Sequence, residues 1–346
     1  MKRITYIDIL KFFGIFLLLF EHTGNYVVLS GNYSLLKVWI CSFHMPLFFV
    51  AYGMTHSGES ILFKDASIYK SIFAFVEKKF SSLIIPYFLW SLIYSKGLGT
   101  EFFIGVLYGT NQSLYEAHTY QVLWFFPVFF LSNILYQIVI EISLRFRFKH
   151  LCFALSAIAF GTCSLLLRNL HAGWGIIFGF DIALTGAIYV ILGKYIRILF
   201  DYIINKKAYI LFAVIWVFIP LGWFIAHNNV ADGYDVNIMA WAVYGKSYIL
   251  GFVAAFLNIC GLLSACYFLR NIRFLPWLGK TTMLIMCIHP IVFQYSVVFC
   301  ALHCGTEIFL ALLNSIITVL ISIPVFLFVN RYIPILIGKR SKEIAR

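Results

Sequence analysis

Long apolar runs follow one another through almost the whole chain. A run of about 20 mostly apolar residues is long enough to cross the hydrocarbon core of a bilayer as a helix. Ten such runs lie near residues 7–29, 36–56, 82–97, 121–141, 151–168, 176–193, 208–226, 246–268, 281–299 and 306–330. Hydrophobic residues make up 62% of the 346 residues and charged residues only 12%, a composition too apolar for a water-soluble domain. The sequence therefore predicts an all-α fold, a polytopic bundle of about ten transmembrane helices that forms one domain over residues 1–346.

Lysine and arginine are concentrated on one side of this predicted topology. Of the 26 Lys and Arg residues, 21 fall in the termini and in every second loop. They are Lys2, Arg3, Lys64, Lys70, Lys78, Lys79, Arg145, Arg147, Lys149, Lys194, Arg197, Lys206, Lys207, Arg270, Arg273, Lys280, Arg331, Lys339, Arg340, Lys342 and Arg346. This asymmetry predicts that both termini are cytoplasmic. It also explains the net charge of +12, and because the cations form no binding motif we expect no nucleic-acid partner.

The first predicted span carries four ionisable residues, Asp8, Lys11, Glu21 and His22. A charged side chain inside a membrane helix costs about 2.5–3.5 kcal/mol, so such residues are functional candidates by default. Lys11 and His22 fall within about 20° of the same helix face and about 16 Å apart along the axis. Asp8 shares that face and can pair with Lys11, whereas Glu21 points about 100° away from His22.

This arrangement places a cation near the cytoplasmic mouth of the helix and an imidazole in the outer half of the bilayer. A basic inner face can hold an anionic cytosolic cofactor such as the phosphates of coenzyme A. The alternative is that Asp8 and Lys11 form an ordinary interfacial ion pair and that His22 only packs between helices.

Five further residues are candidates for a site. His44 enters the second span at a depth close to that of His22, where it can line the same cavity as an oxyanion donor or a substrate contact. His289 precedes Pro290, and proline frees backbone carbonyls that a histidine can bond for purely structural reasons. Asp181 is a carboxylate in the outer part of a span. Trp124 can stack on a sugar or belong to an interfacial aromatic belt, and Asn237 lies in a polar loop.

Several segments together resemble the membrane-bound acyltransferase 3 family. Residues 5–24, TYIDILKFFGIFLLLFEHTG, are similar to the opening of that family, in which ten residues separate a basic residue from a histidine. Residues 43–53, 123–130 and 277–292 resemble its later segments, as FHMPLFFVAYG, LWFFPVFF and WLGKTTMLIMCIHPIV. Residues 181–193 and 237–245, DIALTGAIYVILG and NIMAWAVYG, resemble the branch related to fucose 4-O-acetylases.

The resemblance implies a multi-pass bacterial inner-membrane acyltransferase. It implies transfer of an acetyl group from acetyl-CoA, the acyl donor, to a hydroxyl of a cell-envelope or exported glycan. By position, His22 matches the catalytic histidine of the family and Lys11 its basic partner, although arginine is commoner at that position. We therefore expect catalytic roles for His22, Lys11, Asp8 and His44, and substrate contacts at Trp124, Asp181, Asn237 and His289. The partners implied are the glycan acceptor and the lipid bilayer.

The chemistry requires a base for the hydroxyl proton, donors for the oxyanion and exclusion of water. An imidazole suits the first task because it titrates near neutral pH. His22 either deprotonates the acceptor hydroxyl directly or is itself acetylated and relays the group, and the sequence leaves both routes open. The rival interpretations are a proton-coupled transporter or flippase and a structural partner in glycan export.

The eight cysteines show no CxxC spacing and no metal-ligand pattern, so we expect packing roles and no metal. A disulfide between Cys300 and Cys304 is left open.

Overall fold

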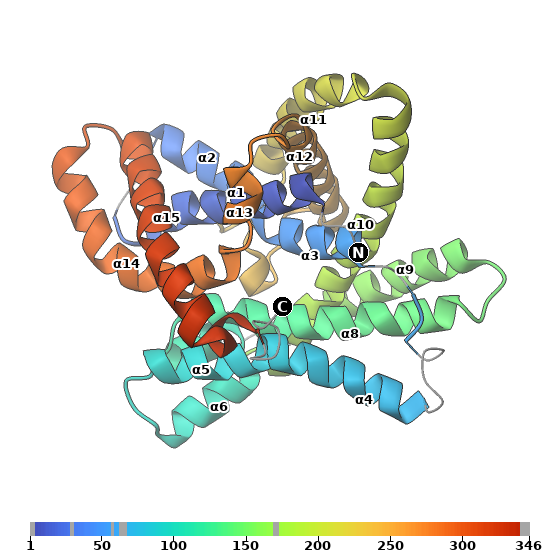
Figure 1. The fold of residues 1–346 in the computed structure, drawn as a ribbon, viewed down its shortest axis with the longest axis horizontal. Coiled ribbons are helices and arrows are strands. Elements are labelled where there is room, and N and C mark those ends of the chain that lie inside the picture. The colour runs from blue at the N-terminus through green and yellow to red at the C-terminus, as the bar shows by residue number, and fades with distance from the viewer. Residues whose placement is uncertain (1–3, 28–30, 57–58, 62–67, 169–172, 340–346) are drawn as a thin grey trace. The chain divides into compact units, whose positions relative to one another are not determined.

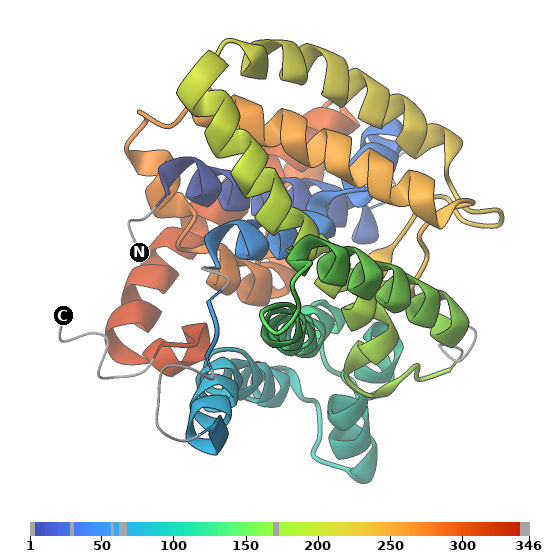
Figure 2. The same ribbon diagram turned by 90° about the vertical axis from the view of Figure 1, so that its right-hand side faces the viewer.

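The computed structural model describes residues 4–27, 31–56, 59–61, 68–168 and 173–339. Within these residues the protein is all-helical, with 81% helix and no strand, which confirms the predicted fold class. Lys2, Arg3, Lys64, Arg340, Lys342 and Arg346 of the predicted inner side lie outside the described residues, as does the end of the first predicted span. The chain divides into two compact units, whose ribbons are shown in Figures 1 and 2.

The first unit comprises Met1–Met54, Tyr195–Met239 and Val243–Leu327. Its helices are α1 (Thr5–His22), α2 (Gly31–Cys41), α3 (His44–Thr55), the second half of α10 (Phe180–Lys207), α11 (Ile210–Asn228), α12 (Tyr248–Phe268), α13 (Phe274–Leu278), α14 (Thr282–His303) and α15 (Glu307–Tyr332) as far as Leu327. Helix α1 contacts α2, α12, α13 and α14, and most of its side chains are buried. Asp8 and Glu21 are among these buried side chains, so α1 holds two of its ionisable residues inside the unit.

The second unit comprises Thr55–Lys194, Ala240–Ala242 and Phe328–Arg346. Its helices are α4 (Ile68–Lys79), α5 (Ile85–Tyr94), α6 (Thr100–Tyr108), α7 (Asn111–Glu116), α8 (Phe125–Ser143), α9 (Lys149–Leu167) and the first half of α10 (Phe180–Lys207). A π-helical segment, Phe80–Ile84, joins α4 to α5. Helices α8 and α9 pack against each other as an antiparallel pair (Figure 1).

Eight helical segments of the described chain are long and apolar enough to cross a membrane. They are Gly31–Thr55, Gln121–Ser143, Lys149–Leu167, Ile177–Lys207, Ile210–Asn228, Tyr248–Phe268, Thr282–His303 and Glu307–Tyr332. The predicted spans 7–29 and 82–97 are helical but do not meet these criteria. Helix α1 has 18 residues and contains three charged residues, and α5 has only 10 residues. The count of ten spans and the cytoplasmic termini stay predictions.

Helix α1 ends earlier than the apolar pattern predicts. It ends at His22, followed by a 3-10 turn over Thr23–Asn25, whereas the predicted span runs to Leu29. The cause is Tyr33 of α2, whose hydroxyl lies 2.6 Å from the carbonyl oxygen of Glu21 and accepts a hydrogen bond from the backbone N–H of Gly24 at 2.9 Å. A side chain from another helix thus satisfies the orphan groups that end a helix. His22 therefore lies in the last turn of α1.

Candidate functional site

Two histidines from distant parts of the chain meet in the first unit. Nδ1 of His22, at the end of α1, lies 3.0 Å from Nε2 of His289 in α14. His289 is fully buried, and its Nδ1 lies 2.8 Å from the carbonyl oxygen of Met286 and 3.2 Å from that of Ile285. Pro290 has no N–H and so leaves the carbonyl of Met286 without its normal helical partner. The structural role expected for His289 is therefore present, because one ring nitrogen bonds the freed backbone, and the other ring nitrogen contacts His22. A role as a substrate contact stays a prediction.

The second nitrogen of His22 faces a carboxylate. Nε2 of His22 lies 3.4 Å from Oε2 of Glu21, and Nζ of Lys37 in α2 lies 3.4 Å from Oε1 of the same carboxylate. The thiol of Cys41 also hydrogen-bonds to Glu21. The Glu21 side chain is only 8% exposed, whereas those of His22 and Lys37 are 21% and 23% exposed. The imidazole is thus accessible while its carboxylate partner is buried.

Sequence reasoning missed the roles of Glu21 and Lys37. Adjacent residues of an ideal helix point about 100° apart, which argued against a contact between Glu21 and His22. Both residues lie in the last turn of α1, where long side chains can bend to a common point. Lys37 is not among the 21 cations that predict the cytoplasmic side. No motif includes Lys37, and the sequence gives no signal for its contact with Glu21, because that contact depends on the fold.

A buried polar chain holds the end of α1 in place beside this site. Asn314 of α15 donates from Nδ2 to Oγ1 of Thr23 at 3.0 Å, and Oγ of Ser296 in α14 donates to Oδ1 of Asn314 at 2.6 Å. Thr23 Oγ1 in turn donates to the carbonyl oxygen of Leu19. Buried polar groups that are fully bonded specify one arrangement of their helices. The residue after His22 is therefore tied to both α14 and α15.

The predicted ion pair at the other end of α1 is present. Nζ of Lys11 lies 3.6 Å from Oδ1 of Asp8, with the Lys11 side chain 29% exposed and that of Asp8 10% exposed. Gly279, which follows α13, packs directly on this turn: a Cβ at position 279 would overlap the backbone carbonyl of Asp8. The late segment 277–292 thus meets α1 twice, through Gly279 at Asp8 and through His289 at His22.

His44 lies in the same unit at the start of α3 and is buried. Its Nδ1 is 2.9 Å from the carbonyl oxygen of Ile40, so Nδ1 carries the proton of the neutral ring. Nε2 of neutral His44 is then an acceptor. This tautomer favours an acceptor for a substrate hydroxyl over the oxyanion donor that the sequence also suggested.

The remaining predicted substrate contacts are dispersed. Asn237 belongs to the first unit, but its Oδ1 accepts from the N–H of Ala231 and its Nδ2 donates to the carbonyl of Asn229, both at 3.0 Å, so its amide holds a loop together. Trp124 and Asp181 belong to the second unit. Trp124 is largely buried in a 3-10 turn before α8, and Asp181 is fully buried at the start of α10. Their roles as substrate contacts stay predictions.

The second unit contains a half-buried lysine that the sequence analysis treated only as an inner-loop cation. Nζ of Lys79, the last residue of α4, donates to Oδ1 of Asn133 in α8 at 3.1 Å. Burial and, to a smaller extent, the neighbouring charge of Lys78 together lower the pKa of Lys79 to about 8. Desolvation lowers this pKa because it disfavours the charged form of the amine.

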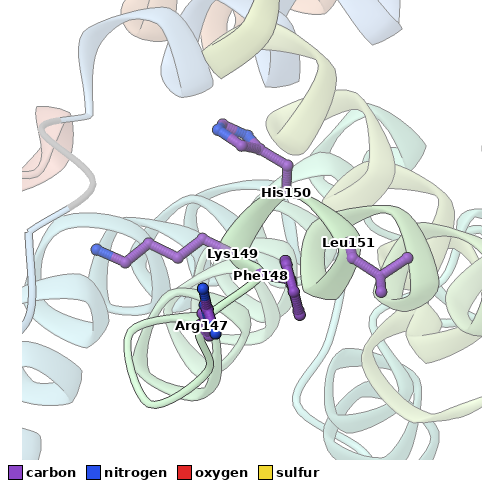
Figure 3. Close-up of a pocket in the computed structure, with 5 residues that line it drawn as sticks. All are labelled: Arg147, Phe148, Lys149, His150 and Leu151. Carbon is purple, nitrogen blue, oxygen red and sulfur yellow. The ribbon is translucent and has the colours of Figure 1, made fainter.

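A surface hollow of about 340 Å³ lies at the turn between α8 and α9 (Figure 3). Arg147, Phe148, Lys149, His150 and Leu151 line it, and all five are exposed. It carries two of the cations that predict the cytoplasmic side, and the five residues that line it include no carboxylate.

The eight cysteines are all free, including Cys300 and Cys304, so the disulfide left open by the sequence is not formed. Among the described residues, no three His, Cys, Asp or Glu side chains are grouped as metal ligands would be. The His22 cluster is instead an acid–base arrangement: an accessible imidazole, a second imidazole that orients it and a buried carboxylate beside its free nitrogen.

Comparison with protein families gives one match. The model of a family described as an acyltransferase domain matches residues 4–330, nearly the whole chain and including both α1 and α14. No curated protein and no solved structure matches the chain.

Proposed function

We propose that this chain, which belongs to the acyltransferase-domain family and is a membrane acyltransferase, transfers an acetyl group from cytosolic acetyl-CoA to a hydroxyl of a cell-envelope or exported glycan. The observation that carries the proposal is the contact of His22 with both His289 and Glu21. An imidazole whose two nitrogens have different, fixed neighbours is suited to moving a proton in one direction.

In the direct route, the acceptor hydroxyl donates its proton to Nε2 of His22 while its oxygen attacks the thioester carbonyl carbon. The tetrahedral intermediate then collapses and the carbon–sulfur bond breaks. The departing thiolate takes the proton from Nε2, which returns His22 to its neutral form. His289 holds the ring orientation throughout, and Glu21 stabilises the positive charge that the ring carries between the two proton transfers.

In the relay route, Nε2 itself attacks the thioester carbonyl and the carbon–sulfur bond breaks, which gives an acetyl-imidazolium that keeps its Nδ1 proton, and the thiolate. The acceptor hydroxyl then attacks this acetyl group and the carbon–nitrogen bond breaks, which releases neutral His22, while the hydroxyl proton ends on the thiolate. Both routes use the same nitrogen. The position of His22 at the end of α1 suits an acceptor that approaches from the side of the bilayer opposite Lys11.

The fucose 4-O-acetylase-like segments support a hexose-containing acceptor, with His44, Trp124, Asp181 and Asn237 as candidate acceptor contacts. The net charge pattern and the family support the inner membrane of a bacterium as the location.

The test is transfer by the purified full-length protein in nanodiscs, given acetyl-CoA labelled in its acetyl group and a panel of glycans with and without fucose. The expected result is label on the glycan that depends on both protein and acceptor. A transporter would instead move the unmodified glycan into sealed vesicles in response to a pH gradient. Uptake of that kind without any labelled glycan would overturn the proposed function.

Lys11 provides a separate prediction about the donor. If its ammonium faces the phosphates of acetyl-CoA, Lys11→Ala should weaken acetyl-CoA binding about tenfold, because a hydrogen bond to a charged group is worth about 1.5 kcal/mol. Lys11→Arg should retain most of the affinity, since it keeps the cation. Isothermal titration of the nanodisc-embedded variants with acetyl-CoA measures this, and equal losses in both variants would argue against a phosphate-facing role.

A further inference from the structure

We propose that Nε2 of His22 is the reacting atom and that Lys37, by neutralising Glu21, keeps His22 in the neutral form that can accept a proton or an acetyl group. The inference rests on the proposed function for its consequence in catalysis, but it concerns the protonation of His22 and can be tested without acetyl transfer. It assigns positioning roles to two residues, Glu21 and Lys37, that the family resemblance does not single out.

The first step is the tautomer of His289. Its Nδ1 lies against two backbone carbonyl oxygens, those of Ile285 and Met286, and a carbonyl oxygen can only accept a hydrogen bond. Nδ1 of His289 must therefore carry a proton. A neutral imidazole has one N–H, so Nε2 of His289 is an acceptor.

The second step carries this assignment to His22. Nδ1 of His22 lies 3.0 Å from the acceptor Nε2 of His289, so Nδ1 of His22 must be the donor in this contact. The lone pair of neutral His22 is then on Nε2. This is the nitrogen beside the Glu21 carboxylate, and it is the only ring atom of His22 that can act as a base or a nucleophile.

The third step concerns charge. A carboxylate 3.4 Å from Nε2 favours a proton there and would hold His22 as an unreactive imidazolium. The other oxygen of Glu21 faces the ammonium of Lys37, also at 3.4 Å. In a largely desolvated cluster the electrically neutral combination is the most stable one. Glu21 and Lys37 already form it, so a proton on His22 would add an uncompensated charge.

Other polar groups near the cluster do not change the net charge of the groups in contact with His22. The thiol of Cys41 donates to Glu21 and stabilises its charged form. The hydroxyl of Tyr33 is bonded to backbone groups, and Nδ1 of His44 to the carbonyl of Ile40. Glu307 of α15 interacts electrostatically with Tyr33. The pair Glu21–Lys37 is thus the charged arrangement in direct contact with His22.

The experiment measures how fast diethyl pyrocarbonate modifies His22 as a function of pH. The reagent acylates only the unprotonated nitrogen of an imidazole, so the midpoint of the rate against pH reports the protonation of His22. Full-length protein in nanodiscs is treated briefly at each pH, and peptide mass spectrometry quantifies modification at His22. His303, at the far end of α14, serves as an internal reference in every sample.

Two substitutions that each remove one charge but keep the size of the side chain should move the pH midpoint of His22 modification in opposite directions. Glu21→Gln leaves Lys37 uncompensated, so modification should persist to a pH lower by about one unit. Lys37→Met leaves Glu21 uncompensated, so the midpoint should rise by about one unit. Lys37→Arg should restore the wild-type midpoint, and the double variant Glu21→Gln/Lys37→Met should return close to it.

If the midpoints of both single variants move in the same direction, or if neither moves, the proposal is overturned. Opposite shifts that cancel in the double variant would support it, because a purely structural disturbance has no reason to produce them. The pH profile of acetyl transfer measured on the same samples separates the two hypotheses. Opposite shifts in modification without any acetyl transfer would support the charge arrangement and count against the proposed function. Acetyl transfer in samples whose modification midpoints do not shift would support the proposed function and count against the charge arrangement.

Discussion

Replacing His22 with alanine should lower the rate of acetyl transfer by about 10²- to 10⁴-fold, the contribution typical of a positioned acid–base group. The substitution removes the nitrogen that takes the acceptor proton in the direct route and the nucleophile in the relay route. It also leaves Nε2 of His289 without its donor. The fold should survive, because α1 is anchored independently through Thr23 and through the capping of its last turn by Tyr33.

The matched control is His303→Ala. His303 is likewise in the last turn of a helix of the first unit, but its Nδ1 faces a backbone carbonyl, that of Phe299 at 2.8 Å, and not a second imidazole. It has no role in the proposed reaction, so its removal should leave the transfer rate within about twofold of the wild type. Acetyl transfer is measured as label on the glycan, and size-exclusion profiles verify folding. A His22→Ala protein that keeps more than a tenth of the activity would exclude His22 as the base or the relay.

Replacing Gly279 with alanine should lower the free energy of unfolding by about 1–3 kcal/mol. The added Cβ would occupy the position of the Asp8 backbone carbonyl, and neither side of this contact is a flexible side chain that can turn away. Helix α1 or α13 must therefore move, and the Asp8–Lys11 pair must move with it. The measurement is the thermal unfolding midpoint of the detergent-solubilised protein, followed by intrinsic tryptophan fluorescence.

Gly305→Ala is the control for this substitution. Gly305 lies between α14 and α15, and a Cβ there would meet no atom within 4 Å. Its midpoint should match that of the wild type. If the two variants unfold at the same temperature, the close approach of α13 to α1 does not contribute to the stability of the fold.

The helical architecture could be predicted because it depends on local properties. Apolar runs of membrane-spanning length are visible without knowledge of any contact, and every predicted span is helical in the described residues. The end of α1 was predicted seven residues too late. Thr23, Gly24 and Asn25 break the apolar run, but the apolar residues 26–29 that follow extend the span pattern to Leu29. What ends the helix is the hydroxyl of Tyr33, which lies eleven positions further on and reaches back from another helix.

The candidate site also has a part that local sequence predicts and a part that depends on the fold. His22, Lys11 and Asp8 follow from the cost of ionisable groups in an apolar helix, and the Asp8–Lys11 pair follows from helical spacing. The contact between His22 and His289 joins residues 267 positions apart, which no local pattern can predict. The family resemblance flagged His289, but not what it touches. Lys37 carries no distinguishing signal in the sequence at all, and only the fold brings it to Glu21.

The two meeting points between α1 and the segment from Gly279 to His289 have a mechanical consequence. On α1 these points, Asp8 and His22, are separated by about 21 Å of continuous helix, which behaves as a stiff rod. Because a continuous helix resists compression along its axis, an axial displacement at Asp8 also displaces the imidazole of His22 at the other end. A ligand that binds at Lys11 and displaces α1 along its axis therefore also changes the distance between His22 and His289.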